Sequence, residues 1–176
     1  MKQPPAETTL KLEVRSVTQL LDRDGSPLIE PRIHPDVAEV LWSDASEEPK
    51  SGRFRIEVTA PTVDSGDEER VREAIRYHYT WEARKAQEEI DETLRDGRKS
   101  LVIGLLVVVL LLTLAEVLLI WSSGRFMAAV SESLIIFSWV VMWSPGELLL
   151  YAHLPIRRRR KLSEKLAEAE VIVRAR

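Results

Sequence analysis

Two glutamates stand out because each lies inside a long apolar stretch. Glu116 lies five residues before the end of stretch 101–121, and Glu132 lies five residues after the start of stretch 127–154. If the stretches form antiparallel helices, the carboxylates fall at similar depth, where they could share a proton or form an acidic ring on an ion path in an oligomer. The simpler alternative is that both side chains extend to the polar surroundings at the nearby ends of the stretches, or that they pair with Arg125. Their position close to those ends favours this second interpretation.

The second stretch also carries a stripe of polar and aromatic residues at helical spacing. Steps of four, three, four and four place its members within about 80° of arc on a helix: Glu132, Ile136, Trp139, Trp143 and Glu147. We expect this stripe to pack on the first stretch or on another subunit, as an ordinary helix-packing surface rather than a substrate path.

A proline follows within the same stretch. Pro145 cannot donate a backbone hydrogen bond, so we expect it to break or kink the helix. Glu147 would then lie near the inner end of the stretch, within reach of Arg157 or its neighbours.

Catalytic patterns are missing from the sequence. There is no cysteine, the three histidines are isolated, and the seven glycines form neither a GxGxxG pattern nor a P-loop. His78, with Tyr77, Tyr79 and Trp81 close by, could form a recognition surface, but packing on a small domain is the simpler interpretation. We therefore expect no enzyme activity, cofactor or metal, and the acidic balance of the N-terminal part argues against nucleic-acid binding.

The length of the apolar stretches indicates a bilayer. Twenty-one helical residues rise about 30 Å, the thickness of the hydrocarbon core. The sequence predicts a transmembrane helix over 100–122, an outer turn over 123–126 and a second transmembrane helix over 127–154. The N-terminus lacks the apolar region of a signal peptide, so we expect stretch 101–121 to be an uncleaved anchor.

Charge predicts the orientation of this hairpin. Residues 1–99 carry 16 Lys and Arg against 22 Asp and Glu, whereas the chain after Leu154 carries 8 against 3. Arg98 and Lys99 precede the first stretch, and the turn contains only Arg125. The positive-inside rule therefore places both termini in the cytoplasm. A basic run follows the second stretch: Arg157, Arg158, Arg159, Arg160 and Lys161. The run could bind anionic lipid headgroups, although its effect on topology is sufficient to explain it.

The remaining chain predicts a small α+β domain. We expect 1–9 to be disordered, 10–66 to form the domain, 67–98 to form a long charged juxtamembrane helix and 155–176 to form a basic tail. Alternation indicates strands at 10–17 and 54–59, with a short helix opening at His34 between them. Two questions stay open. Gly97 is either a hinge or part of a helix that continues into the first apolar stretch. Segment 171–175 is either a third strand that returns to the sheet or a frayed tail. The fold class is an α+β membrane protein with a βαβ-type domain and a helical hairpin.

A pattern in the second stretch resembles an uncharacterised family of bacterial two-span inner-membrane proteins with a small N-terminal cytoplasmic domain. The matching residues are Glu132, Trp139, Trp143, Pro145, Glu147, Tyr151, Pro155 and 157–160, with Glu116 in the first stretch and a weaker likeness over 22–36. The resemblance implies this architecture and a bacterial inner membrane, and it implies no reaction.

Two functional hypotheses follow. The first is a non-enzymatic, membrane-anchored interaction or assembly module that binds a protein partner or a second copy of itself. The alternative is a subunit of an oligomeric channel, pore-forming effector or transporter that uses Glu116 and Glu132. Two spans cannot enclose a pathway, so the alternative requires several copies.

Overall fold

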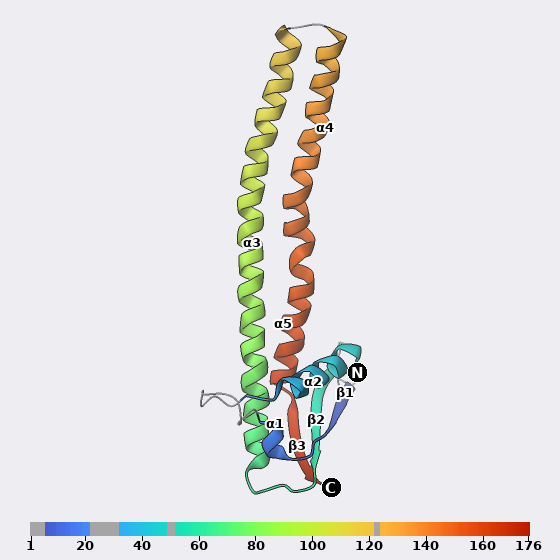
Figure 1. Cartoon of the computed structure of the whole chain (residues 1–176), viewed down its shortest axis with the longest axis vertical. Coiled ribbons are helices and arrows are strands. Elements are labelled where there is room, and N and C mark those ends of the chain that lie inside the picture. Colours follow the sequence, from blue (N-terminus) through green and yellow to red (C-terminus); the bar gives the residue numbers. More distant parts are fainter. Residues whose placement is uncertain (1–5, 22–31, 49–51, 122–123) are drawn as a thin grey trace, which may run out of the picture. The chain divides into compact units, whose positions relative to one another are not determined.

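The computed structural model describes residues 6–21, 32–48, 52–121 and 124–176, and these are mostly helical, with one small parallel sheet and two long apolar helices (Figure 1). The chain forms two compact units. An α/β unit comprises residues 1–86 and 158–176, and a hairpin unit comprises residues 87–157. The boundaries fall inside helices α3 and α5, and only the α/β unit is built from two separate segments of the chain.

The sheet of the α/β unit contains strands β1 (Ala6–Glu13), β2 (Gly52–Ala60) and β3 (Glu170–Ala175), with β2 in the centre. All three run parallel, and Ile56 lies opposite both Leu10 and Val171. Helix α2 (Pro35–Glu47) lies between β1 and β2 in the chain, so the expected strand–helix–strand order is present. The C-terminal segment is the returning third strand rather than a frayed tail.

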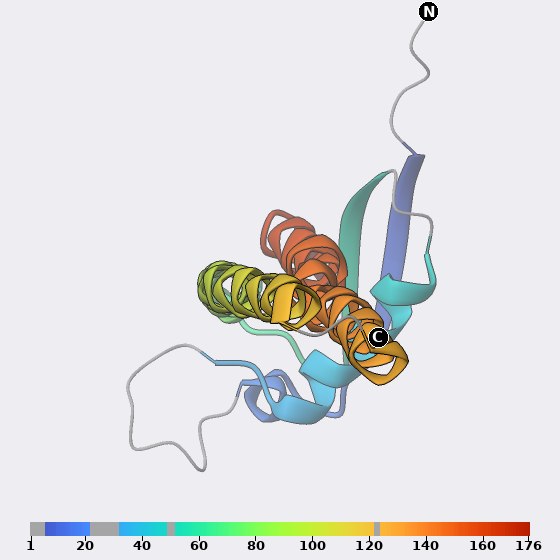
Figure 2. The same cartoon turned by 90° about the horizontal axis from the view of Figure 1, so that it is seen from above.

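Helices cover one face of this sheet. Alternation along β2 turns Phe54, Ile56 and Val58 inward, where they join buried residues from α3 and from the short helix α1 (Val17–Leu20). Helix α1 begins where the sequence predicted the end of a strand, because the Ser16 hydroxyl caps it by accepting a bond from the Thr18 N–H at 3.2 Å. Figure 2 shows β1 and β2 side by side in the view from above.

The other face of the sheet is charged and open. The Arg55 guanidinium lies 2.8 Å from the Glu170 carboxylate, and Arg174 lies 3.8 Å from Glu57. Parallel sheets are usually covered on both faces. Cross-strand ion pairs instead make this uncovered face compatible with water.

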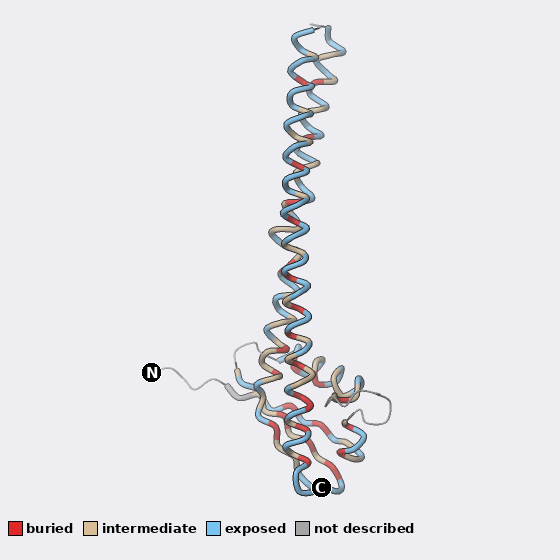
Figure 3. Tube along the Cα trace, turned by 90° about the vertical axis from the view of Figure 1, so that its left-hand side faces the viewer, coloured by how far each residue is buried: buried red, intermediate tan, exposed pale blue. Residues whose placement is uncertain are grey.

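Helix α3 runs without a break from Asp67 to Trp121, so it continues through Gly97. Its start is marked by Gly66, whose φ of 102° is available to glycine, and by the Asp67 carboxylate, which accepts from the Asp64 N–H at 2.9 Å. In the α/β unit this helix turns one face inward, where Val71 and Ile75 are buried. Figure 3 marks buried positions of the helices and strands in red.

The aromatic group around His78 is mainly packing. Tyr79 is buried and its hydroxyl donates to the Ala38 carbonyl at 3.1 Å, while the His78 ring meets the Tyr79 ring edge-on at 5.1 Å. Trp81 is exposed, with Lys85 5.1 Å and Arg32 5.7 Å from its ring centroid. The interpretation as a helix side packed on the small domain therefore holds for Tyr79, and Trp81 stays on the surface.

The second apolar stretch begins with α4 (Arg125–Glu147), continues as the π-helical turn η1 (Leu148–Ala152) and leads into α5 (His153–Ala167). Pro145 lies inside α4, so the helix does not break there, and the expected kink stays a prediction. The disturbance comes three residues later, where the Leu148 N–H points to the carbonyls of both Pro145 and Ser144. Pro145 supplies no N–H to the turn before it, and the hydrogen-bond pattern changes in the turn after it.

Candidate functional site

Small residues form the contact between α3 and α4 in the hairpin unit. The Ser131 hydroxyl donates to the Ala115 carbonyl at 3.3 Å, and a Cβ at Gly104 would lie 3.5 Å from the Pro145 ring. Small side chains at a helix interface let two backbones approach closely. We call these buried residues the seam, and several recur every seven positions: Gly97, Gly104 and Ala115 on α3, with Ser131, Ser138 and Pro145 on α4.

The predicted stripe of the second stretch faces away from this seam. Ile136 is 66% exposed, Trp139 78% and Trp143 76%. The expectation that the stripe packs on the first stretch is therefore wrong, since the backbones meet through the small residues and large side chains would hold them apart. Packing of the stripe on another subunit stays a prediction.

Glu116 and Glu132 lie on one side of the hairpin. Each immediately follows a seam residue, Ala115 or Ser131, and these two face each other. In antiparallel helices the next residue turns to the same side on both, so the two carboxylates share a face. Both glutamates are exposed, and neither forms an ion pair with Arg125 within the described part of the chain. A shared proton stays a prediction.

A shallow hollow of about 490 Å³ lies on the outer face of α4 and η1. Two rows of residues at four-residue spacing line it: Trp139, Trp143, Glu147 and Tyr151 in one, and Met142, Gly146 and Leu150 in the other. A Cβ at Gly146 would meet no atom within 4 Å, so the floor of the hollow is open. Helical spacing predicted that Trp139, Trp143 and Glu147 share one face, but the hollow also depends on Gly146 and on the π-helical turn.

The basic run after the second stretch is partly paired. Arg159 lies 2.6 Å from the Glu82 carboxylate, and Arg160 lies 2.8 Å from that of Glu164. Arg157, Arg158 and Lys161 are exposed. The expected pairing of Arg157 with Glu147 is not found among the described residues.

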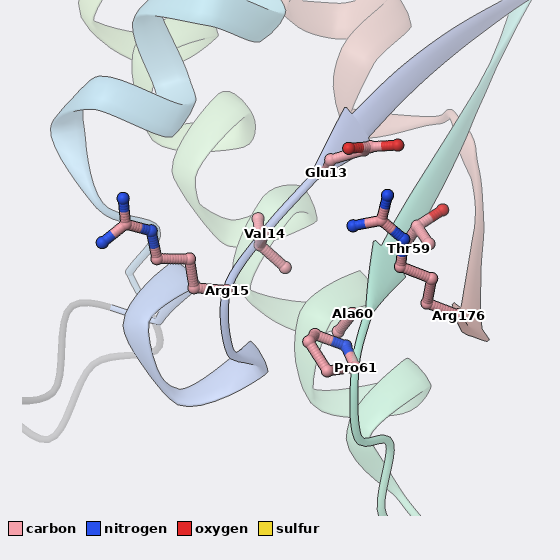
Figure 4. A pocket seen from close by; sticks show the side chains of 7 residues that line it. All are labelled: Glu13, Val14, Arg15, Thr59, Ala60, Pro61 and Arg176. Carbon is pink, nitrogen blue, oxygen red and sulfur yellow. The ribbon is translucent and has the colours of Figure 1, made fainter.

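A smaller hollow of about 200 Å³ lies where the parallel strands end, the edge at which open α/β sheets bind ligands. Figure 4 shows Glu13 and Arg176 turned toward the same space, whereas Arg15 points away from them. The Val14 and Arg176 N–H groups are already bonded to the carbonyls of Thr59 and Ala60, both at 2.9 Å. This edge therefore offers one guanidinium and no convergent set of donors.

Two further observations concern titratable groups. Burial lowers the pKa of His78 from its ordinary value, with Arg32 acting in the same direction and Glu82 against it. His153 is buried at the start of α5, and its Nδ1 has no hydrogen-bond partner. Within the described ranges, no three His, Asp or Glu side chains gather in a way that could hold a metal ion.

Comparison with known proteins adds no assignment: no protein family, curated protein or solved structure matches the chain. The resemblance to two-span bacterial membrane proteins therefore remains a prediction based on the second stretch.

Proposed function

We propose that the chain is an integral membrane protein whose hairpin crosses a bilayer and holds the α/β unit at its surface as a non-enzymatic interaction or assembly module. The observation that carries the proposal is the burial pattern of the hairpin. In the most apolar 18-residue window of each of the two long helices, only 11% is buried. The core helix of a water-soluble protein would be mostly buried.

Charge supports an orientation with both termini in the cytoplasm. Basic residues at 98–99 and 157–161 flank the inner, cytoplasmic ends of the two stretches, and the turn between the stretches has only Arg125. The resemblance of the second stretch supports the bacterial inner membrane as the location.

The open face and edges of the sheet support binding of a protein partner. Among the residues that the structure describes, β1 and β3 each pair on one side only, so each leaves an edge available to another strand. Lys11, Arg53 and Glu57 lie on the uncovered face and suit a polar contact. We propose that this part of the molecule recognises another protein.

Topology can be tested directly because the chain has no cysteine. We expect Arg125→Cys to react with a membrane-impermeant maleimide on intact cells. Glu88→Cys and Glu168→Cys, at exposed positions, should react only after permeabilisation. Release of the protein by alkaline carbonate, or labelling of all three variants in intact cells, would overturn the proposal.

Partner binding can be tested with a photo-crosslinking amino acid at Lys11 on the open face and, as a control, at Arg84 on the exposed side of α3. We expect a specific crosslinked product from position 11 alone. A protein that stays monomeric in mild detergent and forms no crosslink from position 11 would argue against an interaction module.

The shared face of Glu116 and Glu132 favours one alternative, an oligomer that conducts ions past these carboxylates. In liposomes this alternative predicts a cation flux that falls in Glu116→Gln and Glu132→Gln. Unchanged flux in both variants would remove the carboxylates from the path, and an absence of flux in the unmodified protein would exclude a channel.

A further inference from the structure

The hollow on α4 and η1 combines an apolar wall with one acidic end. Trp139, Met142 and Trp143 line its first half, and Glu147, Leu150 and Tyr151 line its second half. Glu147 is exposed and belongs to no ion pair in the described ranges. π-helical turns occur frequently at functional sites, and here the turn supplies Leu150 and Tyr151.

Contacts with α3 give the depth of the hollow in a bilayer, and this step rests on the proposed function. A Cβ at Gly104 would lie 3.5 Å from Pro145, and one at Gly97 would lie 2.8 Å from Leu149. Glu147 is therefore level with positions 97–104 of α3, where charged residues give way to the apolar stretch at 101. Consequently, Trp139 and Trp143 lie in the hydrocarbon, and Glu147 lies at the level of the headgroups.

We propose that this hollow is a selective site for a phospholipid whose headgroup carries a primary ammonium, such as phosphatidylethanolamine. One acyl chain lies along the two tryptophans and Met142, over the open floor at Gly146. The ammonium donates charge-assisted hydrogen bonds to the Glu147 carboxylate. A choline headgroup has no N–H to donate, and an anionic headgroup is repelled by Glu147.

Charge also argues against a second copy as the occupant. A symmetric pair of chains meeting across this hollow would bring Glu147 of each copy together, because a two-fold interface uses the same patch on both. The residues lining the hollow contain no Lys or Arg to separate the two carboxylates. A lipid ammonium neutralises Glu147, whereas a second copy adds a like charge.

Tryptophan quenching by brominated acyl chains tests the proposal in the full-length protein. Trp42, Trp81 and Trp121 are replaced by Phe, so that only the two tryptophans of the hollow report. The protein is reconstituted in phosphatidylcholine bilayers containing equal mole fractions of brominated phosphatidylethanolamine, phosphatidylcholine or phosphatidylglycerol. We expect the ethanolamine lipid to compete for the site about threefold better than the choline lipid, the range of an exposed charge pair.

Two variants and one control separate the site from the general lipid annulus. Glu147→Gln should equalise quenching by the ethanolamine and choline lipids. Gly146→Leu should reduce quenching by all three lipids, since the added side chain fills open space without clashing. Glu132→Gln, at an exposed position of α4 outside the hollow, should keep the preference.

Each contrary outcome is distinct. Equal quenching by the three lipids, or a preference unchanged by Glu147→Gln, leaves only an annulus and overturns the proposal. Preference for the glycerol lipid would point to the basic run instead, and weak quenching by all lipids together with a crosslink between copies at Leu150→Cys would assign the hollow to self-association. Failure of the proposed function itself would appear differently, as release of the same preparation from the bilayer by carbonate.

Discussion

The α/β unit and the apolar stretches of the hairpin unit bury different kinds of residue. In the α/β unit the interior holds large side chains, including Ile56, Ile75 and Tyr79, and most charged residues lie outside. In the hairpin unit the interior holds Gly104, Ala115 and Ser131, and leucines and tryptophans lie outside. Water drives large apolar groups together, whereas lipid gives them no such preference and leaves close backbone packing to decide. This difference is the one expected if the proposed bilayer surrounds the hairpin and water surrounds the α/β unit.

The largest effect should come from the core of the α/β unit. Ile56 on the central strand is fully buried, so Ile56→Ala should lower the free energy of unfolding of this unit by about 2–5 kcal/mol. Pulse proteolysis of the reconstituted protein in urea measures it. The matched control is Ile103→Ala, on the exposed side of α3 in the hairpin unit, and a loss as large there would contradict the comparison.

A second test enlarges a seam residue. A Cβ at Gly104 would already contact the Pro145 ring at 3.5 Å. We therefore expect the longer side chain of Gly104→Leu to push the helices apart and weaken hairpin packing by about 1–3 kcal/mol, as overpacking generally does. The readout is the rate of disulfide formation between Ala115→Cys and Ser131→Cys, which should fall. Gly146→Leu makes the same chemical change in open space and should leave that rate unchanged; equal effects would mean that the seam is not what holds the helices together.

Acid should destabilise the α/β unit through His78. Burial lowers the pKa of His78 below its ordinary value of 6.5, so the unfolded chain takes up the proton at a higher pH than the folded chain does. The contribution of neutral His78 is complete above 6.5, and it is lost as the pH falls from 6.5 toward the lowered pKa of the folded protein. The difference between the urea midpoints at pH 7.5 and pH 5.5 should be smaller in His78→Gln than in the unmodified protein. An unchanged difference would mean that other groups cause the acid sensitivity.

The smallest effect should come from the open face of the sheet. Glu170→Gln removes the ion pair with Arg55, and since both side chains are partly exposed we expect a loss of at most about 1 kcal/mol. The same proteolysis at low and high ionic strength measures how this ion pair's contribution to the free energy of unfolding depends on salt. That contribution, and with it the salt dependence, should be absent from the variant. Glu168→Gln, an exposed neighbour, is the control.

The sequence predicted the elements whose residues recur at a regular spacing. Alternation predicted strands at 10–17 and 54–59, which overlap β1 and β2, and the long helix that begins at 67 was predicted as well. Long-range pairing left no local signal, so the composition of 171–175 suggested a strand but could not show that it joins β2. The seam was not predicted, although its small residues recur every seven positions at Ser131 and Ser138, because the tryptophans and glutamates of the same stretch form a second pattern at helical spacing. The hollow could not be predicted, because it requires the π-helical turn.

The position of β3 in the chain has a consequence for biosynthesis. This strand pairs with β2, yet it is separated from it by both long apolar helices. A nascent chain therefore holds β1 and β2 for the whole time that the hairpin is being made, with one edge of the central strand still unpaired. The α/β unit completes its sheet only after α4 has left the ribosome, so maturation of this unit reports that the hairpin has been made.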